Sequence, residues 1–220
     1  MKLLFKYATR GRPEWFKDTL SRWYSLLSKK HDYQFVISID ADDDSMNNTE
    51  IKDFLSTKDN LVLFTGNSKT KIEAINADMS GLGFDILVVV SDDMIPIVAG
   101  YDDIIVQDMQ RQFPTGFGAL HYNDGKHGKD HLITLSIMNK ALYDHFGYIY
   151  YFEYRSTWCD NEFTDVTKML NCYWYSPQVI VEHAWMENGS DETYQKNSGD
   201  YHTDKAIYDR RKAQGFPKCF

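Results

Sequence analysis

Two adjacent carboxylates follow directly on an apolar run, in the segment Ser91-Asp92-Asp93-Met94 after residues 86–90. A buried charge is costly unless it is paired or coordinates a cation, and adjacent residues of an extended chain point to opposite sides. One carboxylate can therefore face a metal ion while the other contacts a hydroxyl group or braces the loop. Oxygen ligands suit Mg²⁺ or Mn²⁺, which bridge diphosphate oxygens. The alternative is a pair of aspartates that caps a loop in water.

A second acidic segment, Asp40-Ala41-Asp42-Asp43-Asp44, follows another apolar run. Its first, third and fifth positions match an EF-hand loop, but Ser45 stands where the turn needs glycine and Ile51 where a bidentate glutamate is needed. The spacing therefore argues against a calcium loop. We expect Asp40 to contact a nucleoside at the end of a strand, and residues 42–44 to form a solvated loop.

The first 90 residues alternate between apolar, β-branched runs and helical patterns. The predicted strands are 3–8, 34–39, 61–64 and 86–90, and the predicted helices begin at Pro13 and cover 49–55 and 68–79. Such a series predicts an α/β fold with a mostly parallel, doubly wound central sheet flanked by helices. Ligands of these sheets bind beyond the carboxyl ends of the strands. Those ends carry Thr9-Arg10, Asp40 and Ser91-Asp92-Asp93.

The rest of the chain is predicted to be mixed α/β. Helices are expected at 101–111, 140–146, 161–170 and 200–212, and strands at 119–122, 132–137 and 178–182. We find no internal repeat and no low-complexity linker, so residues 1–220 are predicted to form one domain.

Composition excludes several classes of protein. With 43% hydrophobic and 25% charged residues, and no apolar run near the roughly 18 residues that cross a bilayer, the chain is expected to be globular and cytoplasmic. Residues 1–7 resemble a first strand and not a signal peptide. The net charge of −8 disfavours whole-surface binding of nucleic acid. Three widely spaced cysteines, Cys159, Cys172 and Cys219, are expected to be ordinary thiols.

The order of these parts resembles the nucleotide-sugar glycosyltransferases of the GT-A fold, particularly the inverting family 2 group. The resemblance rests on residues 9–13 after the first strand, Asp40 after the second, and the aspartate pair at the place of the D-x-D metal motif of that fold. It includes Trp158-Cys159-Asp160-Asn161-Glu162, similar to the acidic acceptor-side motif. The chain departs from the family in its adjacent aspartates and in Cys159-Asp160, which replaces a Glu-Asp pair. Residues 1–97 would bind the nucleotide, and 98–220 would face the acceptor.

The resemblance implies roles for individual residues. Cations and hydrogen-bonding groups that would approach the nucleotide or the donor sugar are Thr9, Arg10, Arg12, Asp40, Lys71, Asn76 and Asp92. Asp93 and the later His183 would bind the metal. Guanidinium groups pair well with phosphates, although a surface ion pair is the alternative for Arg10 and Arg12. A lysine such as Lys71 is more often simply solvated.

The acceptor side is assigned in the same way. Asp160 is our candidate for the base that takes the proton of the acceptor hydroxyl, with Trp158 as a stacking wall and Glu162 as a hydroxyl-binding group. Asp160 also fits the N-cap of the helix that follows it. His121 and Asp124 lie in or beside a predicted loop after a strand, where they would contact the donor sugar or the acceptor, or form a structural turn.

The function implied is metal-dependent transfer of a sugar, with inversion, from a nucleoside diphosphate donor to a hydroxyl acceptor. The donor is expected to be a UDP-sugar and the cofactor Mn²⁺ or Mg²⁺. The acceptor would be a surface glycan, a small molecule or, against the acidic charge, a hydroxymethylated base in DNA. Two alternatives stay open, a nucleotidyltransferase and a sugar-binding or nucleotide-binding module without turnover. A nucleotidyltransferase would carry a Gly-rich, basic phosphate loop after the first strand, where this chain has only Gly11.

Overall fold

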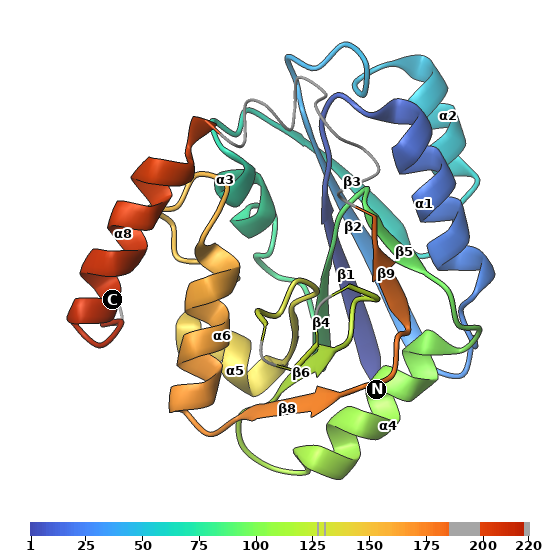
Figure 1. Cartoon of the computed structure of the whole chain (residues 1–220). Helices are drawn as coiled ribbons and strands as arrows, with labels where there is room; N and C mark the ends of the chain where they lie inside the picture. The colour runs from blue at the N-terminus through green and yellow to red at the C-terminus, as the bar shows by residue number, and fades with distance from the viewer. Residues whose placement is uncertain (127, 130, 185–198, 218–220) are drawn as a thin grey trace.

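A computed structural model describes residues 1–126, 128–129, 131–184 and 199–217 (Figure 1). It holds one seven-stranded sheet of order β3-β2-β1-β4-β7-β6-β8 and a two-stranded sheet, β5-β9. The strands are β1 (Lys2–Ala8), β2 (Asp32–Asp40), β3 (Leu61–Gly66), β4 (Ile86–Val90), β5 (Met94–Pro96), β6 (Ala119–Tyr122), β7 (Ile137–Asn139), β8 (Tyr173–Ser176) and β9 (Val181–His183). The helices are α1 (Pro13–Ser25), α2 (Thr49–Ser56), α3 (Lys71–Asn76), α4 (Tyr101–Gln112), α5 (Lys140–Phe146), α6 (Cys159–Met169) and α8 (Tyr201–Ala213).

The N-terminal half forms the parallel part of the sheet. β1 lies between β2 and β4 and pairs with both in parallel, and β2 pairs with β3 in the same way. Tyr7 stands opposite Ile37 on one side and opposite Val90 on the other. The carboxyl ends of these strands therefore meet at one edge of the sheet, which confirms the predicted doubly wound arrangement.

Side chains of β1 alternate between two cores, as the period of a strand requires. Phe5 faces a core that it shares with α1, α2 and α4, whereas Leu4 faces a second core that it shares with α3, α5, α6 and α8. Figure 1 shows the two groups of helices on opposite sides of the sheet. Within α1, Phe16, Leu20 and Trp23 are fully buried, as their helical spacing predicts.

The C-terminal half extends the same sheet with mixed directions. β7 runs antiparallel to β4 and β6, and β6 runs parallel to β8. The strand predicted at 132–137 is displaced to Ile137–Asn139, and the one predicted at 178–182 is Val181–His183. β5 and β8 were not predicted, because Met94–Pro96 is short and the half-buried residues of β8 show no apolar alternation.

Two further expectations concern the cysteines and the length of the helices. Cys159 and Cys172 are free and buried, as expected of ordinary thiols, and Cys219 lies outside the described residues. None of the helices in the described residues has the length and apolar composition needed to span a bilayer.

Candidate active site

Asp93 and His183 meet where β4 ends and β9 ends. β5 and β9 pair antiparallel with Met94 opposite His183, and the N–H of Ala184 donates to the carbonyl of Asp93 at 2.9 Å. This short two-stranded sheet brings residues 90 positions apart in the sequence to one place. The Nε2 of His183 lies 3.5 Å from the Oδ2 of Asp93. An oxygen donor and a nitrogen donor therefore converge at the carboxyl edge of the sheet.

A second carboxylate lies behind the histidine ring. The Oδ2 of Asp124 is 3.8 Å from the Nδ1 of His183, and the backbone N–H of His183 donates to the carbonyl of Asp124 at 3.0 Å. Asp124 is itself held, because its carboxylate accepts from the hydroxyl of Thr134 and from the N–H of Lys126. Asp124 therefore orients the imidazole, which is a more specific role than the loop contact predicted for it.

The charges of this group depend on one another. Burial raises the pKa of Asp93, but hydrogen bonding and charge from His183, the charge of Lys71 and the hydroxyl of Ser91 lower it by more, so that it lies well below its ordinary value. Burial lowers the pKa of His183, and the carboxylates of Asp124 and Asp93 raise it by more. The pair is therefore an ionised carboxylate beside an imidazole with an enhanced affinity for a proton.

Asp92 points away from its neighbour and into the protein. Its carboxylate accepts from the hydroxyl of Tyr7 at 2.9 Å and from that of Thr9 at 3.0 Å, and burial raises its pKa to about 7. We predicted contacts of Asp92 with the ribose or sugar and of Thr9 with the nucleotide. The structure instead joins the two side chains to each other, because successive residues of an extended chain face opposite ways. Tyr7 was missed, although alternation along β1 places it on the same face as Thr9.

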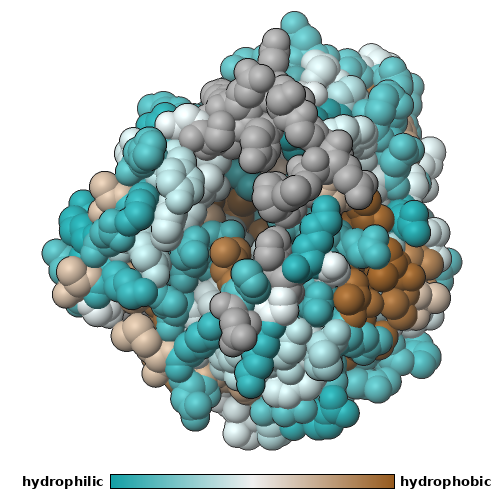
Figure 2. Space-filling view, viewed as in Figure 1, coloured by the Kyte–Doolittle hydropathy of each residue, from teal (hydrophilic) through white to brown (hydrophobic). Residues whose placement is uncertain are grey.

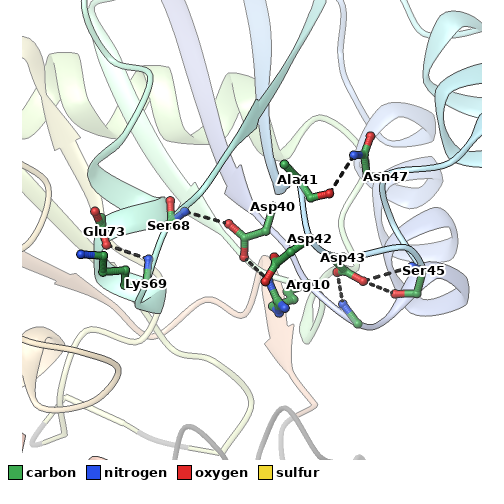
Figure 3. Close-up of polar contacts among 11 residues, drawn as sticks. Arg10, Asp40, Ala41, Asp42, Asp43, Ser45, Asn47, Ser68, Lys69 and Glu73 are labelled. Carbon is green, nitrogen blue, oxygen red and sulfur yellow. Dashed lines mark hydrogen bonds and ion pairs between the residues drawn. The ribbon is translucent and has the colours of Figure 1, made fainter.

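Arg10 and Asp40 form an ion pair at the ends of β1 and β2 (Figure 3). The Nη1 of Arg10 lies 2.8 Å from the Oδ2 of Asp40 and 2.6 Å from the Oδ1 of Asp42, which is 72% exposed. The other oxygen of Asp40 accepts from the N–H of Ser68. The side chain of Arg10 is 36% exposed, so this edge presents a fixed guanidinium group beside a carboxylate.

The acidic loop after β2 is only partly solvated. Asp43 is 7% exposed, and its carboxylate accepts from the N–H of Gly11 at 2.8 Å and from the hydroxyl of Ser45 (Figure 3). The expectation of a solvated loop is therefore wrong for Asp43 and right for the exposed Asp42 and Asp44. Gly11 adopts a φ of +72°, which favours glycine. Asp43 fixes the turn that carries the arginines.

Arg12 stands at the N-cap of α1 and faces the same edge. Its guanidinium group lies 5.4 Å from the centre of the Trp15 ring, and its positive charge lowers the pKa of Asp92 against the effect of burial. Arg10 and Arg12 thus place two cations on one short loop beside the aspartate pair.

Lys71 and Asp160 complete the cluster around Asp93. Lys71, the exposed first residue of α3, lowers the pKa of both Asp93 and Asp160 by its charge. Burial nevertheless raises the pKa of Asp160, against the effects of Lys71, the Asn161 N–H and His183. Two carboxylates and two cationic groups, from α3, the segment between β4 and β5, α6 and β9, therefore lie within electrostatic reach of one another.

Asp160 does not cap α6. The helix begins at Cys159, and the cap residue is Trp158, which has a φ of +61° and makes no side-chain cap bond. Asp160 lies in the first turn, where its carboxylate accepts from the N–H of Asn161 at 2.9 Å. The capping alternative is thus wrong, and the left-handed conformation of Trp158 sets the direction in which the helix starts.

Three predicted site residues point elsewhere. The amide of Asn76 is committed to backbone groups of Ile149 and Tyr150, including a bond of 2.6 Å to the Tyr150 carbonyl. His121 is 1% exposed and lies 2.6 Å from the hydroxyl of Tyr173. Burial lowers the pKa of His121 to about 4, so it is a neutral core histidine.

Glu162 is the third. It is 6% exposed, and its carboxylate accepts two bonds from Arg211, at 2.7 and 2.8 Å, and one from the hydroxyl of Tyr154. It lines an apolar cavity of about 120 Å³ beneath α6, together with Phe146, Phe163 and Phe216. A buried carboxylate needs such partners, so Glu162 is not available to an acceptor hydroxyl.

Comparison with known proteins supports the architecture. No family model matches the sequence, and the search of curated proteins finds no match to it. Among solved structures, the mannosyltransferase PcManGT from Pyrobaculum calidifontis, in complex with GDP-Man and Mn²⁺, is similar with a TM-score of 0.65 and 14% identity over 83% of this chain. S. aureus TarS 1-349 is similar with a TM-score of 0.68 and 14% identity over 84% of this chain.

This chain has a GT-A-like fold. It spans 56% of the length of the PcManGT chain and 60% of that of TarS 1-349. TarS 1-349 in complex with UDP is similar at a TM-score of 0.66. In a GT-A-like sheet the edge that carries Asp40, Asp93 and His183 is the edge at which ligands of doubly wound sheets bind. In the space-filling view, hydrophilic side chains cover much of the face shown, and a hydrophobic patch lies on its right-hand side (Figure 2).

Proposed function

We propose that this protein is a metal-dependent glycosyltransferase that moves a sugar, with inversion, from a nucleoside diphosphate donor to a hydroxyl acceptor. The observation that carries the proposal is the convergence of Asp93, His183, Lys71 and Asp160 at the carboxyl edge of the sheet. Such a group combines a metal-binding pair, a cation and a partly desolvated carboxylate. These are the parts that departure of a diphosphate and deprotonation of a hydroxyl require.

The structural neighbours support the donor class. PcManGT is a mannosyltransferase with GDP-Man and Mn²⁺ bound, and TarS 1-349 forms complexes with UDP and with UDP-GlcNAc. We infer that the donor here is likewise a nucleotide sugar, with UDP as the first nucleotide to test. Arg10 and Asp40 would face the nucleoside, and Arg12 and Lys71 the diphosphate, since guanidinium and ammonium groups both pair with phosphate oxygens.

The residues at the edge fit a divalent metal. Among the described residues, no group of three or more His, Cys, Asp or Glu side chains is arranged to hold a metal ion. Asp93 and His183 supply two donors, and Mg²⁺ or Mn²⁺ at phosphate sites commonly takes its remaining ligands from phosphate oxygens and water. When bound, the ion neutralises charge on the leaving diphosphate. Asp124 keeps the imidazole of His183 oriented toward Asp93.

Asp160 would act as the base. Because burial raises the pKa of its carboxyl group, the carboxylate holds a proton better than a solvated aspartate does, which suits proton transfer from an acceptor hydroxyl. Its Oδ1 accepts from the N–H of Asn161, and we propose that Oδ2 takes the proton of the acceptor hydroxyl. Trp158, directly before α6, would bound the acceptor side. A surface glycan or a small molecule is the proposed acceptor, with a hydroxymethylated DNA base as the less favoured one.

A thermal-shift panel tests the donor site. UDP, GDP, CDP, TDP and ADP are each added with and without Mn²⁺, because a ligand at about 100 times its dissociation constant stabilises a protein by roughly 2.7 kcal/mol. We expect one nucleotide to stabilise the chain in a Mn²⁺-dependent manner. The dependence on Mn²⁺ should disappear in Asp93→Asn and persist in Asp53→Asn, a matched change at an exposed position on α2.

Two outcomes would contradict the proposal. The donor site is wrong if no nucleoside diphosphate raises the melting temperature under either condition. If a nucleotide binds but the cognate nucleotide sugar releases no nucleoside diphosphate with any hydroxyl acceptor or with water, the protein is a binding module without turnover.

A further inference from the structure

The turn before Trp158 is held by a side chain from the C-terminal helix. Asp204 of α8 is 0% exposed, and its carboxylate accepts from the backbone N–H groups of Arg155, Ser156 and Thr157 at 3.0, 2.9 and 2.8 Å. The hydroxyl of Thr157 contacts the same carboxylate at 3.3 Å. Three successive N–H donors on one buried carboxylate replace the hydrogen bonds that a regular element would supply.

The same face of α8 makes further contacts around this turn. Asp200, directly before the helix, accepts from the Nε of Arg155 at 2.7 Å. The rings of Tyr201 and Tyr208 lie 5.5 and 5.0 Å from the ring of Trp158. Arg211 binds Glu162 on α6, and α6 and α8 lie side by side in Figure 1. The spacing 201, 204, 208 and 211 is that of one helical face.

This turn is connected to both sides of the candidate active site. The carbonyl of Arg155 accepts from the N–H of Ile72 at 3.2 Å, directly after Lys71. Trp158, directly after the turn, has a left-handed backbone conformation. The next residue begins α6, which carries Asp160 in its first turn. A shift of residues 155–157 would therefore move Lys71 and Asp160 relative to Asp93.

We propose that Asp204 is a positioning residue of the active site, and that α8 fixes the placement of Asp160 and Lys71 through the 155–157 turn. The inference rests on the proposed function for its catalytic consequence. Its structural part, that the Asp204 carboxylate orders this turn, stands independently of the reaction. Asp204 itself touches no reacting group; it acts through the backbone of the turn.

Asp204→Asn is the primary variant. Asparagine has the same shape but presents only one acceptor oxygen, and its NH₂ group faces N–H donors of the turn. Asp209→Asn is the matched control, since Asp209 lies on the same helix, has a side chain that is 55% exposed, and forms a surface ion pair with Lys205. Both variants are measured by release of nucleoside diphosphate from the nucleotide sugar whose nucleotide stabilises the wild-type chain.

We expect Asp204→Asn to lower kcat by about 10- to 100-fold, because misplacement of reacting groups by about 1 Å costs rates of that size. The Mn²⁺-dependent thermal shift should persist, because Asp93 and His183 are held together by the pairing of β5 with β9 and by Asp124. The KM for the donor should rise by less than kcat falls, because Lys71 is only one of the groups proposed to face the donor. Asp209→Asn should match the wild type. An unchanged kcat in a folded Asp204→Asn, or a loss carried by the KM alone, overturns the proposal.

Amide hydrogen exchange in the wild-type chain tests the structural part without a variant. The N–H groups of Ser156 and Thr157 should exchange far more slowly than those of the neighbouring residues around Phe152, which is 61% exposed. Equal exchange rates would overturn the proposal even if Asp204→Asn fails to fold. If the wild-type chain binds no nucleoside diphosphate while Ser156 and Thr157 are protected, the proposed function fails and the ordering of the turn by Asp204 stands.

Discussion

The carboxylates of the N-terminal half and those of the C-terminal half are held in place by different kinds of structure. In the N-terminal half, Asp40 ends the parallel strand β2, and Asp92 and Asp93 come shortly after the parallel strand β4. Tyr7 in β1 and Thr9 directly after β1 are the partners of Asp92. Strand register alone brings these groups together, since Tyr7 stands opposite Val90.

In the C-terminal half, Asp160 follows a turn without a strand. The backbone N–H groups of this turn, residues 155–157, donate to the carboxylate of Asp204, which lies between 47 and 49 residues further along the chain. The start of α6 is then fixed by a left-handed Trp158 and by the buried ion pair of Glu162 with Arg211. The N-terminal half therefore owes its geometry to the sheet, whereas the C-terminal half owes it to a few buried polar contacts with one helix. Single substitutions should disturb the second half more than the first.

The largest effect is expected from the candidate base. Asp160→Asn removes the proton acceptor while it preserves shape, so kcat for transfer should fall by about 10²- to 10⁴-fold. Stabilisation by the nucleoside diphosphate with Mn²⁺ should be unchanged, because Asp93 and His183 are intact. The measurement is product formation under saturating donor. Asp144→Asn on α5, an exposed partner of Lys140, is the matched control. Retained turnover, or lost nucleotide binding, would show that Asp160 has another role.

The next largest effect is expected on stability, and it compares a buried ion pair of α8 with an exposed ion pair of the same helix. Arg211→Met leaves the 8%-exposed carboxylate of Glu162 without its guanidinium partner, which should cost about 3–5 kcal/mol of unfolding free energy. Arg210→Met, its neighbour paired with Glu153 at the surface, should leave the free energy of unfolding unchanged within error. Urea denaturation measures both. Equal effects of the two variants would contradict the idea that α8 docks through its buried polar face.

The same difference explains how much could be predicted from the sequence. The parallel sheet and the edge shared by Arg10, Asp40 and Asp93 follow from local alternation of strands and helices, and the fold is confirmed. The structure also brings His183 to within 3.5 Å of Asp93, although their roles toward a metal stay predictions.

The errors concern side chains whose partners lie far away in the sequence. Asn76 binds the backbone 74 residues later, His121 meets Tyr173 52 residues later, and Glu162 meets Arg211 49 residues later. Asparagine, histidine and glutamate occur both in active sites and in buried structural contacts, and no local sequence pattern distinguishes these two roles. Asp204 carries no sequence signal either, because its function depends on a turn that only tertiary packing brings to it.

Lys6 offers a test of burial in the N-terminal half. Its side chain is 0% exposed and donates to the hydroxyl of Ser38 at 2.6 Å. Burial lowers its pKa from 10.5 to about 8, against the charge of Asp78. Between pH 8 and 10.5 the unfolded chain therefore binds more protons at this position than the folded chain, so the stability of the wild type rises with pH.

The comparison variant is Lys6→Met, which has no proton to lose. Relative to this variant, the wild type should gain about 3 kcal/mol of unfolding free energy as the pH rises from 8 to 10.5. Urea denaturation at several pH values measures the difference, and below pH 8 it should be constant. A difference that does not change between pH 8 and 10.5 would mean that Lys6 is solvated and that the sheet tolerates its charge without cost.

The smallest effect on stability is expected at Asp42, the more exposed of the two aspartates that pair with Arg10. Asp42 is 72% exposed, so Asp42→Asn should lower the free energy of unfolding by less than about 1 kcal/mol. Asp40→Asn should cost more, because the Asp40 side chain is 11% exposed and also accepts from the N–H of Ser68. Thermal unfolding of the two variants compares them directly. If Asp42→Asn lowers the stability more than Asp40→Asn, the acidic loop and not the end of β2 holds Arg10 in place. The register of the strands would then no longer account for the geometry of the N-terminal half.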